Sequence, residues 1–447
     1  MHSDRFRLLT LAVALTSVCV SSRSLAQQPS EPVSAPVEPA PSTPAAPVKV
    51  APPPPAATPV VTSTVSEATA APAPEKKELA FSAEPGKGLT FTSPDERFSL
   101  TTRARIQARA TLTETRGEAT ELVGVKTARL YFQGHVYSKD LKYVLQLALG
   151  AGDFEEGSSS PIFDAYIEST HLRDLNLRVG QYFVPFDRAR TVREFALQLA
   201  DRPVLIPELT LDRDAGITLS SNDLGGLGGR LAYSLGVFGG DGRNRVAVSR
   251  PGLLYVVRLA VLPFGSFDDN VEGDIERKPN PRLAIGVAGA YNQHTDRPRS
   301  TTGTRYVLDG FNYLHGAADL VFKWAGFSLL SEIVVRKAHR DSRSGAGDDK
   351  KPVTEYSREG WGYFVQSGIM LTDHIEFAGR WGQFKALGKT DPKLEQLIAQ
   401  SGHELTFGLN YYFNQHFLKI QADAGLRWGK WSDPRDHVAR LQIDAMF

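Results

Sequence analysis

Residues 97–113 read RFSLTTRARIQARATLT, and from Phe98 onward they separate into two sets of alternate positions. One set carries Arg103, Arg105 and Arg109 together with serine, threonine and glutamine, whereas the other set contains no charged residue. A guanidinium group keeps its charge and presents a planar fork of N–H donors that matches phosphate oxygens. Such a row indicates a surface that can bind small anions one after another.

An alternation with period two places this row on a β-strand, because successive strand side chains point to opposite faces. A helix would distribute the arginines around its circumference. The segment is longer than the roughly 5–6 residues usual in globular sheets, and it exceeds the roughly 9–11 residues of a tilted membrane strand. We therefore predict a membrane strand with an uncharged outer face and a wet, cationic inner face.

The same two-faced pattern returns along the chain as far as its C-terminus. We count sixteen such segments, of which the sixth shows the weakest pattern: residues 97–113, 127–136, 142–149, 162–170, 175–184, 216–220, 231–237, 253–262, 283–291, 314–324, 327–336, 361–371, 375–381, 404–413, 417–427 and 438–447. An even number returns both ends to one side of the membrane, as in single-chain bacterial barrels. The predicted fold is all-β, a 16-stranded antiparallel transmembrane β-barrel.

The connections support this topology independently. Short links at 138–139, 324–326, 372–373 and 414–416 alternate with long polar loops at 113–123, 151–160, 186–214, 239–252, 294–311, 338–359, 386–402 and 429–437. Short periplasmic turns and long outer loops are typical of outer-membrane barrels. The link at 263–281 breaks the rule, since it is long where a short turn is expected, and nothing in the sequence explains it.

The N-terminal part differs in composition from the rest. Residues 1–26 have the positive start, apolar core and small final residues of a secretory signal peptide, and they hold the only cysteine, Cys19. Residues 27–84 are rich in proline and alanine and should be a disordered periplasmic linker. The barrel domain is predicted for residues 95–447. The whole chain has a formal net charge of +1, and removal of residues 1–26 would leave 48 basic and 49 acidic residues, a charge of −1. Bulk charge therefore predicts no anionic partner, nucleic acid included.

The last strand ends on an apolar face formed by Ala439, Leu441, Ile443, Ala445 and Phe447. A terminal phenylalanine on such a face resembles the signal read by the barrel assembly machinery of the outer membrane. We therefore expect Phe447 to act as an assembly signal, and we expect the barrel to contact outer-membrane lipid and lipopolysaccharide.

Four pieces of the sequence carry a family resemblance: DAYIE at 164–168, VGQYFVPF at 179–186, GVFGGDG at 236–242 and GLNYYF at 408–413. In this order and spacing the chain from 95 to 447 resembles the phosphate-selective porins O and P. The resemblance implies a homotrimer whose third long loop folds inward as a constriction. It also implies a ladder of lumen arginines that conducts phosphate-like anions.

The candidate anion-binding residues lie on the polar faces of the predicted strands and in the loop at 186–214. They are Arg103, Arg105, Arg109, Arg129 and Arg178 on strands, with Arg188, Arg190, Arg193 and Arg202 in the loop. The alternative is that these arginines pair with carboxylates of the same interior. A loop this long without obvious structure is usually functional, which favours packing inside the pore.

We therefore expect an outer-membrane porin for passive diffusion of small anions, with phosphate or polyphosphate first among them. One alternative is a general-diffusion porin of the same fold with little selectivity, because the lumen charges nearly balance. Another is a barrel that serves as an envelope tether or adhesin. A hydrolase is disfavoured, because the sequence lacks the G-x-S-x-G, H-E-x-x-H and P-loop patterns. We expect no enzyme activity, no cofactor and no bound metal.

Overall fold

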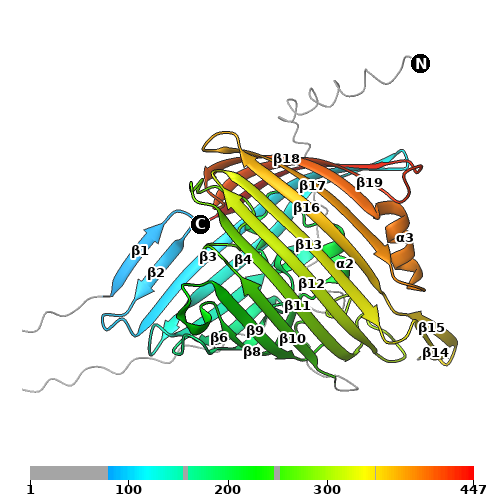
Figure 1. Cartoon of the computed structure of the whole chain (residues 1–447), viewed down its shortest axis with the longest axis horizontal. Coiled ribbons are helices and arrows are strands. Elements are labelled where there is room, and N and C mark those ends of the chain that lie inside the picture. Colours follow the sequence, from blue (N-terminus) through cyan, green and yellow to red (C-terminus); the bar gives the residue numbers. More distant parts are fainter. Residues whose placement is uncertain (1–78, 155–159, 246–251, 348) are drawn as a thin grey trace, which may run out of the picture. The chain divides into compact units, whose positions relative to one another are not determined.

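The computed structural model describes residues 79–154, 160–245, 252–347 and 349–447 (Figure 1). In its main sheet, which is antiparallel, each strand pairs with the next strand of that sheet along the chain, and sixteen of these strands close into a barrel where β20 pairs with β3. These strands are β3 (Phe98–Thr115), β4 (Glu118–Val136), β5 (Leu141–Ala148), β6 (Ile162–Ser169), β7 (Asn176–Phe183), β8 (Arg213–Ser221), β9 (Leu231–Phe238), β10 (Leu254–Val261), β11 (Arg282–Thr295), β12 (Phe311–Trp324), β13 (Phe327–Ala338), β16 (Gly360–Met370), β17 (Ile375–Ala386), β18 (His403–Asn414), β19 (Leu418–Trp428) and β20 (Asp436–Met446).

All sixteen predicted strands are confirmed, including the weakest, which is β8. The predicted signal peptide at 1–26 and residues 27–78 of the predicted linker lie outside the described residues. Closure gives every strand two hydrogen-bonded neighbours, so the barrel leaves no long free edge among its wall strands.

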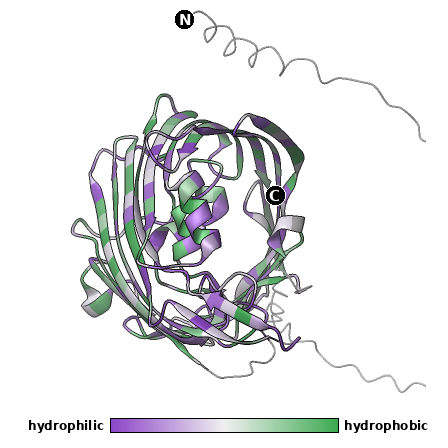
Figure 2. Cartoon of the chain, turned by 90° about the vertical axis from the view of Figure 1, so that its right-hand side faces the viewer, coloured by the Kyte–Doolittle hydropathy of each residue, from purple (hydrophilic) through white to green (hydrophobic). Residues whose placement is uncertain are grey.

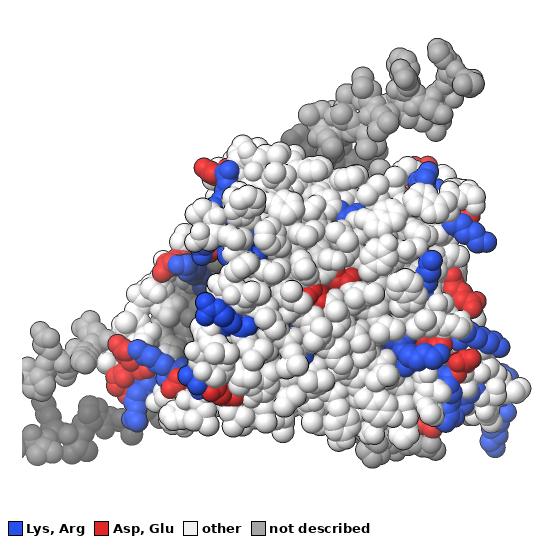
Figure 3. All heavy atoms as spheres, in the orientation of Figure 1, with Lys and Arg blue, Asp and Glu red and all other residues white. Residues whose placement is uncertain are grey.

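The two faces of the wall differ as the alternation predicted. On β18, Phe407, Leu409 and Tyr411 point outward and are exposed, while Glu404 and Asn410 point inward and are buried. Most of the outer wall visible in Figure 3 carries no charge, and Lys, Arg, Asp and Glu gather toward the two ends. The barrel is therefore an outer-membrane barrel with an apolar belt. Among the described residues, no helix is long and apolar enough to cross a bilayer.

The two ends of the barrel differ in their connections. At one end, which we call the turn end, β12 and β13 are joined by Ala325 and Gly326 alone, and most of the other links are short. The opposite end, the loop end, carries most of the long connections, among them the exposed hairpin of β14 (Ser342–Ala346) and β15 (Pro352–Tyr356).

One predicted long loop is wrong. Residues 113–123 belong to β3 and β4, which continue to Thr115 and Glu118 and meet in a tight turn at Arg116 and Gly117. Both turn residues have positive φ, at 52° and 88°, as the two-residue turn of a twisted hairpin requires. The polar composition of the segment concealed the Thr, Leu and Val residues that keep it extended.

The ordered barrel domain begins earlier than predicted. The strands β1 (Ala80–Glu84) and β2 (Gly88–Thr92) form a hairpin, so the disordered linker does not extend to Glu84 and the domain does not begin at residue 95. β2 pairs with β3 from Leu89 opposite Thr102 onward, along the part of the β3 edge that β20 does not reach. The rings of Phe81 and Phe91 pack at 5.2 Å, which holds the hairpin together.

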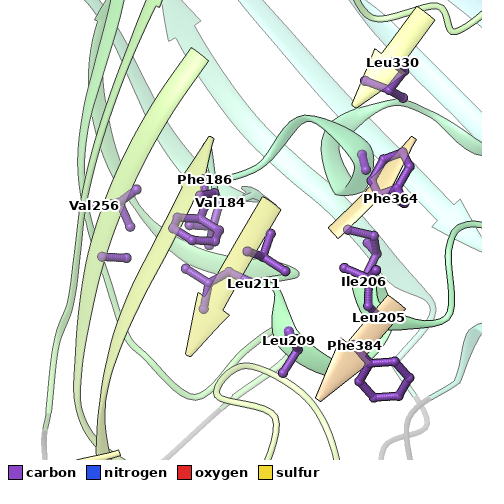
Figure 4. Packing of buried hydrophobic residues seen from close by; sticks show 14 of the residues in the cluster. Val184, Phe186, Leu205, Ile206, Leu209, Leu211, Val256, Leu330, Phe364 and Phe384 are labelled. Atoms are coloured by element: carbon purple, nitrogen blue, oxygen red, sulfur yellow. The ribbon is translucent and has the colours of Figure 1, made fainter. Parts of the chain in front are cut away.

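The loop between β7 and β8, residues 184–212, folds into the barrel and is called here the constriction loop. It carries two short helices, α1 (Arg188–Thr191) and α2 (Leu205–Leu209). In Figure 2 the loop end faces the viewer, and part of the chain lies inside the ring of strands. The buried Phe186, Leu205 and Ile206 of the loop pack against inward-facing side chains of the wall, among them Val256, Leu330, Phe364 and Phe384 (Figure 4). The predicted inward constriction is confirmed.

A helix from the loop end covers part of this cluster. It is α3 (Pro392–Ser401), whose Leu394 is fully buried in the same cluster. The inner wall has an apolar arc, against which one side of the constriction loop packs, and a polar arc formed mainly by β3, β4 and β18 to β20. The loop also bonds to the polar arc, where Asp423 accepts the main-chain N–H of Ala200 at 2.8 Å. The remaining passage lies against polar and charged side chains.

Candidate anion passage

The three arginines of β3 all point inward, but they have different partners. Arg105 is buried and donates to Asp444 from Nε and Nη2, at 2.8 and 2.5 Å. Arg109 donates to Asp201 at 2.8 Å and to the carbonyl oxygen of Ala200 at 2.5 Å. Both charges are therefore already matched, and Arg109 holds the constriction loop against the wall.

Arg103 has a different environment. Its Nη2 donates to Gln133 at 2.9 Å, its Nε has no partner, and it forms no ion pair with the described residues. Arg193 of the constriction loop lies close enough to repel it electrostatically and likewise forms no ion pair among the described residues. Two like charges without a carboxylate form a place where an anion would be stabilised.

The other strand arginines are paired. Arg129 donates to Asp153 at 2.6 Å and lies 3.0 Å from Glu194, and its guanidinium stacks on the ring of Phe163. Arg178 donates to Glu168 at 2.8 Å and stacks on Tyr166. These contacts fit the alternative in which interior arginines balance interior carboxylates.

The loop arginines divide in the same way. Arg188 pairs with Asp269 and Asp319, each at 2.7 Å, and Arg190 pairs with Asp212. Arg202 donates to main-chain carbonyl oxygens of its own loop, at 2.9 Å in the case of Ala189, and lies 3.7 Å from the carboxylate of Glu194. Burial lowers the pKa of Arg202 to about 10, and the nearby carboxylate of Glu194 offsets only part of that shift.

Two adjoining cavities surround these loop residues. The smaller, of about 70 Å³, lies between the loop and the wall of β4 to β8, and the larger, of about 360 Å³, opens on the loop-end side. Arg190, Glu194 and Arg202 line both. Eight cationic side chains line the two cavities together, against four carboxylates, those of Glu194, Asp201, Glu208 and Asp212.

Four of those eight cations are not among the candidate anion-binding residues predicted from the sequence: Lys126, Arg213, Arg299 and Arg427. Arg427 continues the inward set of β19 with Lys419 and Asp423, so the alternation did contain its signal. Arg299 belongs to the loop between β11 and β12, and no sequence pattern placed it over the pore. Arg299 and Arg427 form no ion pair with the described residues.

Electrostatics at the loop end support a cationic entrance. Burial and the neighbouring Arg358 and Arg190 lower the pKa of Arg299, despite the opposing carboxylate of Glu208. For Glu194, burial alone would raise the pKa, but Arg129 and the surrounding cations hold it well below its ordinary value. The region therefore favours negative charge.

No protein-family model matches the chain, and no curated protein matches its sequence. Among solved structures, the fold is similar to that of OmpF from Salmonella typhi, in complex with daunomycin, at 13% identity and a TM-score of 0.51, covering 79% of this chain and 99% of that one. Similarity also extends to an anion-selective porin from Comamonas acidovorans, at 11% identity, 78% and 100% coverage and a TM-score of 0.49. The channel DcaP of Acinetobacter baumannii is 13% identical, with 81% and 100% coverage and a TM-score of 0.47.

At these identities the likeness concerns the backbone fold and not the residues of the passage. The sixteen closed strands, the apolar belt and the loop folded into the lumen occur together in the part of the chain that the structure describes. This chain has the fold of an outer-membrane porin.

Proposed function

We propose that the protein is a porin through which small anions diffuse passively across the outer membrane, with phosphate first among them. One observation carries the proposal: Arg103, Arg193, Arg299 and Arg427 point toward the lumen or its cavities and form no ion pair with the described residues. Buried or half-buried charges are normally paired, so an unpaired set is the kind of feature that a passing anion would complete.

The order of these residues along the barrel supports a route. Arg299 and Arg427 line the larger cavity at the loop end, and Arg190 and Arg202 connect it to the smaller cavity. Arg193 lines the smaller cavity, and Arg103 lies beside it on β3. An anion would meet a new guanidinium group at each step.

The narrowness of the passage matters for selectivity. Salt screens charges separated by more than about 8 Å at physiological ionic strength, so a wide lumen would show little preference. The constriction loop fills the apolar side of the barrel and brings Arg193 near the wall. In this proposal the paired arginines, Arg105 and Arg109 among them, anchor the loop and the free ones bind the anion.

The proposal includes a topology and an assembly route. The turn end faces the periplasm, because the first wall strand, β3, begins at this end and the last, β20, finishes there. Residues 1–26 direct export and residues 27–78 form a periplasmic linker. Phe447 lies exposed on the outer face, and its main chain bonds to Ala104 through both N–H and carbonyl groups. In this proposal the apolar C-terminal face that ends on Phe447 is read by the assembly machinery before the strand pairs. We further propose a homotrimer in a lipid and lipopolysaccharide bilayer.

A general-diffusion porin is the second candidate, and a specific observation favours it. Most interior arginines are paired with carboxylates, so much of the lumen is locally neutral. The two candidates differ in the reversal potential measured under a salt gradient.

The test uses the purified full-length protein in planar lipid bilayers. Replacing Arg103, Arg193, Arg299 and Arg427 by glutamine should move the reversal potential toward that of an unselective pore and reduce block of chloride current by added phosphate. The control removes the same charge from exposed positions at the barrel ends, by replacing Arg97, Arg116, Arg173 and Arg435 with glutamine. If the lumen variant keeps the wild-type reversal potential, general diffusion is the better description.

A further inference from the structure

The long connection between β10 and β11, residues 262–281, also folds into the lumen, from the turn end. We call it the turn-end segment. Glu272 and Asp274 are buried, at 5% and 1% exposure, although a connection at this end would ordinarily lie in water. Buried carboxylates require partners, and their partners show what the segment does.

Glu272 bonds directly to the constriction loop. Its main-chain N–H donates to the carbonyl oxygen of Ala196 at 3.2 Å, and its carboxylate accepts the main-chain N–H of Gln198 at 2.8 Å. The same carboxylate accepts Nε2 of Gln366, on the barrel wall, at 2.7 Å. Glu272 therefore links the loop to the wall through one side chain.

Apolar and ionic contacts repeat this connection on either side. Val271 packs against the small cluster of Val192, Ala196 and Leu197 in the constriction loop. Asp269 pairs with Arg188 of the loop at 2.7 Å. Residues 269–272 of the turn-end segment therefore contact the constriction loop through hydrogen bonds, an apolar contact and an ion pair.

The return part of the segment is fixed to the barrel. Asp274 pairs with Arg282 and accepts the main-chain N–H of Gly326 at 2.8 Å. The main-chain N–H of Ala325 donates to the carbonyl oxygen of Lys278 at 2.9 Å. The base is therefore attached to the rigid wall, and the tip at Glu272 supports the loop.

We propose that Glu272 positions the constriction loop, so that the width of the pore is set jointly by the loop and by the turn-end segment. The inference depends on the proposed function only in requiring that the barrel conducts ions. It accounts for the length of a connection that the topology alone would leave short. It also assigns the segment a role in permeation without any contact between Glu272 and the permeating ion.

Glu272→Ala should loosen the loop around Gln198, because the main-chain N–H of Gln198 loses its acceptor and Nε2 of Gln366 keeps only Oε1 of Gln198, at 3.0 Å. The loss of charged, buried hydrogen bonds should raise the fraction of time spent in displaced loop positions by about tenfold or more. In single-channel recordings this appears as a higher mean conductance with new current fluctuations. The matched control is Glu276→Ala, which removes the same charge from the exposed base of the segment, where Glu276 contacts Lys278 and Arg282.

A cysteine pair keeps the test decisive if Glu272→Ala folds poorly. In a Cys19→Ala background, Ala196→Cys and Val271→Cys should form a disulfide between the loop and the segment, since Val271 packs against the cluster that contains Ala196 and the neighbouring Glu272 bonds to the carbonyl oxygen of Ala196. Oxidation should restore a quiet current in the Glu272→Ala protein, and reduction should return the fluctuations. Correct folding is checked by heat-modifiable migration on a gel.

The outcomes separate the two proposals. A wild-type protein that forms no channel contradicts the proposed function itself. A conducting wild type whose folded Glu272→Ala variant has the same conductance and noise overturns the positioning role, as does a folded double-cysteine protein that never forms the disulfide.

Discussion

The pairing of Arg105 with Asp444 gives a prediction whose size follows from the structure. Both side chains are 0% exposed, and Asp444 accepts two hydrogen bonds from Arg105 and one from Gln107 at 3.1 Å. Removing one partner of a buried ion pair typically costs about 3–5 kcal/mol, because the charge that stays behind is poorly compensated. Arg105 would keep only the more distant Glu194, whose carboxylate lies 3.6 Å from Nη1. Asp444→Ala should therefore lower the free energy of unfolding by an amount in that range.

The measurement is urea unfolding of the protein folded into lipid vesicles, followed by tryptophan fluorescence. The control is Glu84→Ala, which breaks the exposed pair with Lys87, whose side chains are 56% and 65% exposed, and should change the stability by only about 0–1 kcal/mol. The double variant Arg105→Met with Asp444→Leu should recover most of the loss, since no charge is then left buried. If Asp444→Ala is as stable as the control, Arg105 is not locked in place, and it would belong to the anion-binding row instead.

Three further outcomes are expected. Phe364→Ala opens a cavity beneath the constriction loop and should cost about 3–5 kcal/mol in the same unfolding assay, with a rise in conductance because the loop loses its support; an unchanged stability would show that the loop is held by polar contacts alone. Cysteine introduced at Gly345, in the loop-end hairpin, should react with an impermeant reagent on intact cells, whereas cysteine at Thr372 should not, and the opposite pattern would reverse the proposed topology. Phe447→Gln should leave export intact and slow folding, so that unfolded protein accumulates in the periplasm; wild-type amounts of heat-modifiable barrel would argue against an assembly signal.

The wall was predictable because its physics is local. The alternation of polar and uncharged side chains in residues 98–113 reflects only which face of that strand meets lipid, and the same is true of the other wall strands. The errors lie where local signals conflict. The hairpin at 80–92 follows a proline-rich stretch, and it pairs with the part of the β3 edge, Ser99 to Thr102, that β20 does not cover.

The anion passage was harder to predict, because the register between neighbouring strands decides whether a carboxylate lies opposite a given arginine. Arg105 and Asp444 are 339 residues apart, and they meet only through the closure of β3 against β20. Arg103, two residues away on the same face, has no such carboxylate opposite it among the described residues. Residue type and spacing give the inward face, but they do not tell which of its arginines are left free.

The constriction loop is bonded to wall strands that come much later in the chain, and this has a consequence for how the chain folds. Ala200 is bound by Asp423, 223 residues further on, and Phe186 and Leu205 pack in a cluster that includes Phe364 and Phe384 from much later strands. During synthesis and export the loop therefore exists long before its binding partners, with its apolar side chains in water. Contacts of such high sequence separation form slowly, and exposed apolar segments are prone to aggregation in the meantime. This barrel should depend on periplasmic chaperones to shield the loop until the last strands arrive, so its final width is decided at the very end of folding.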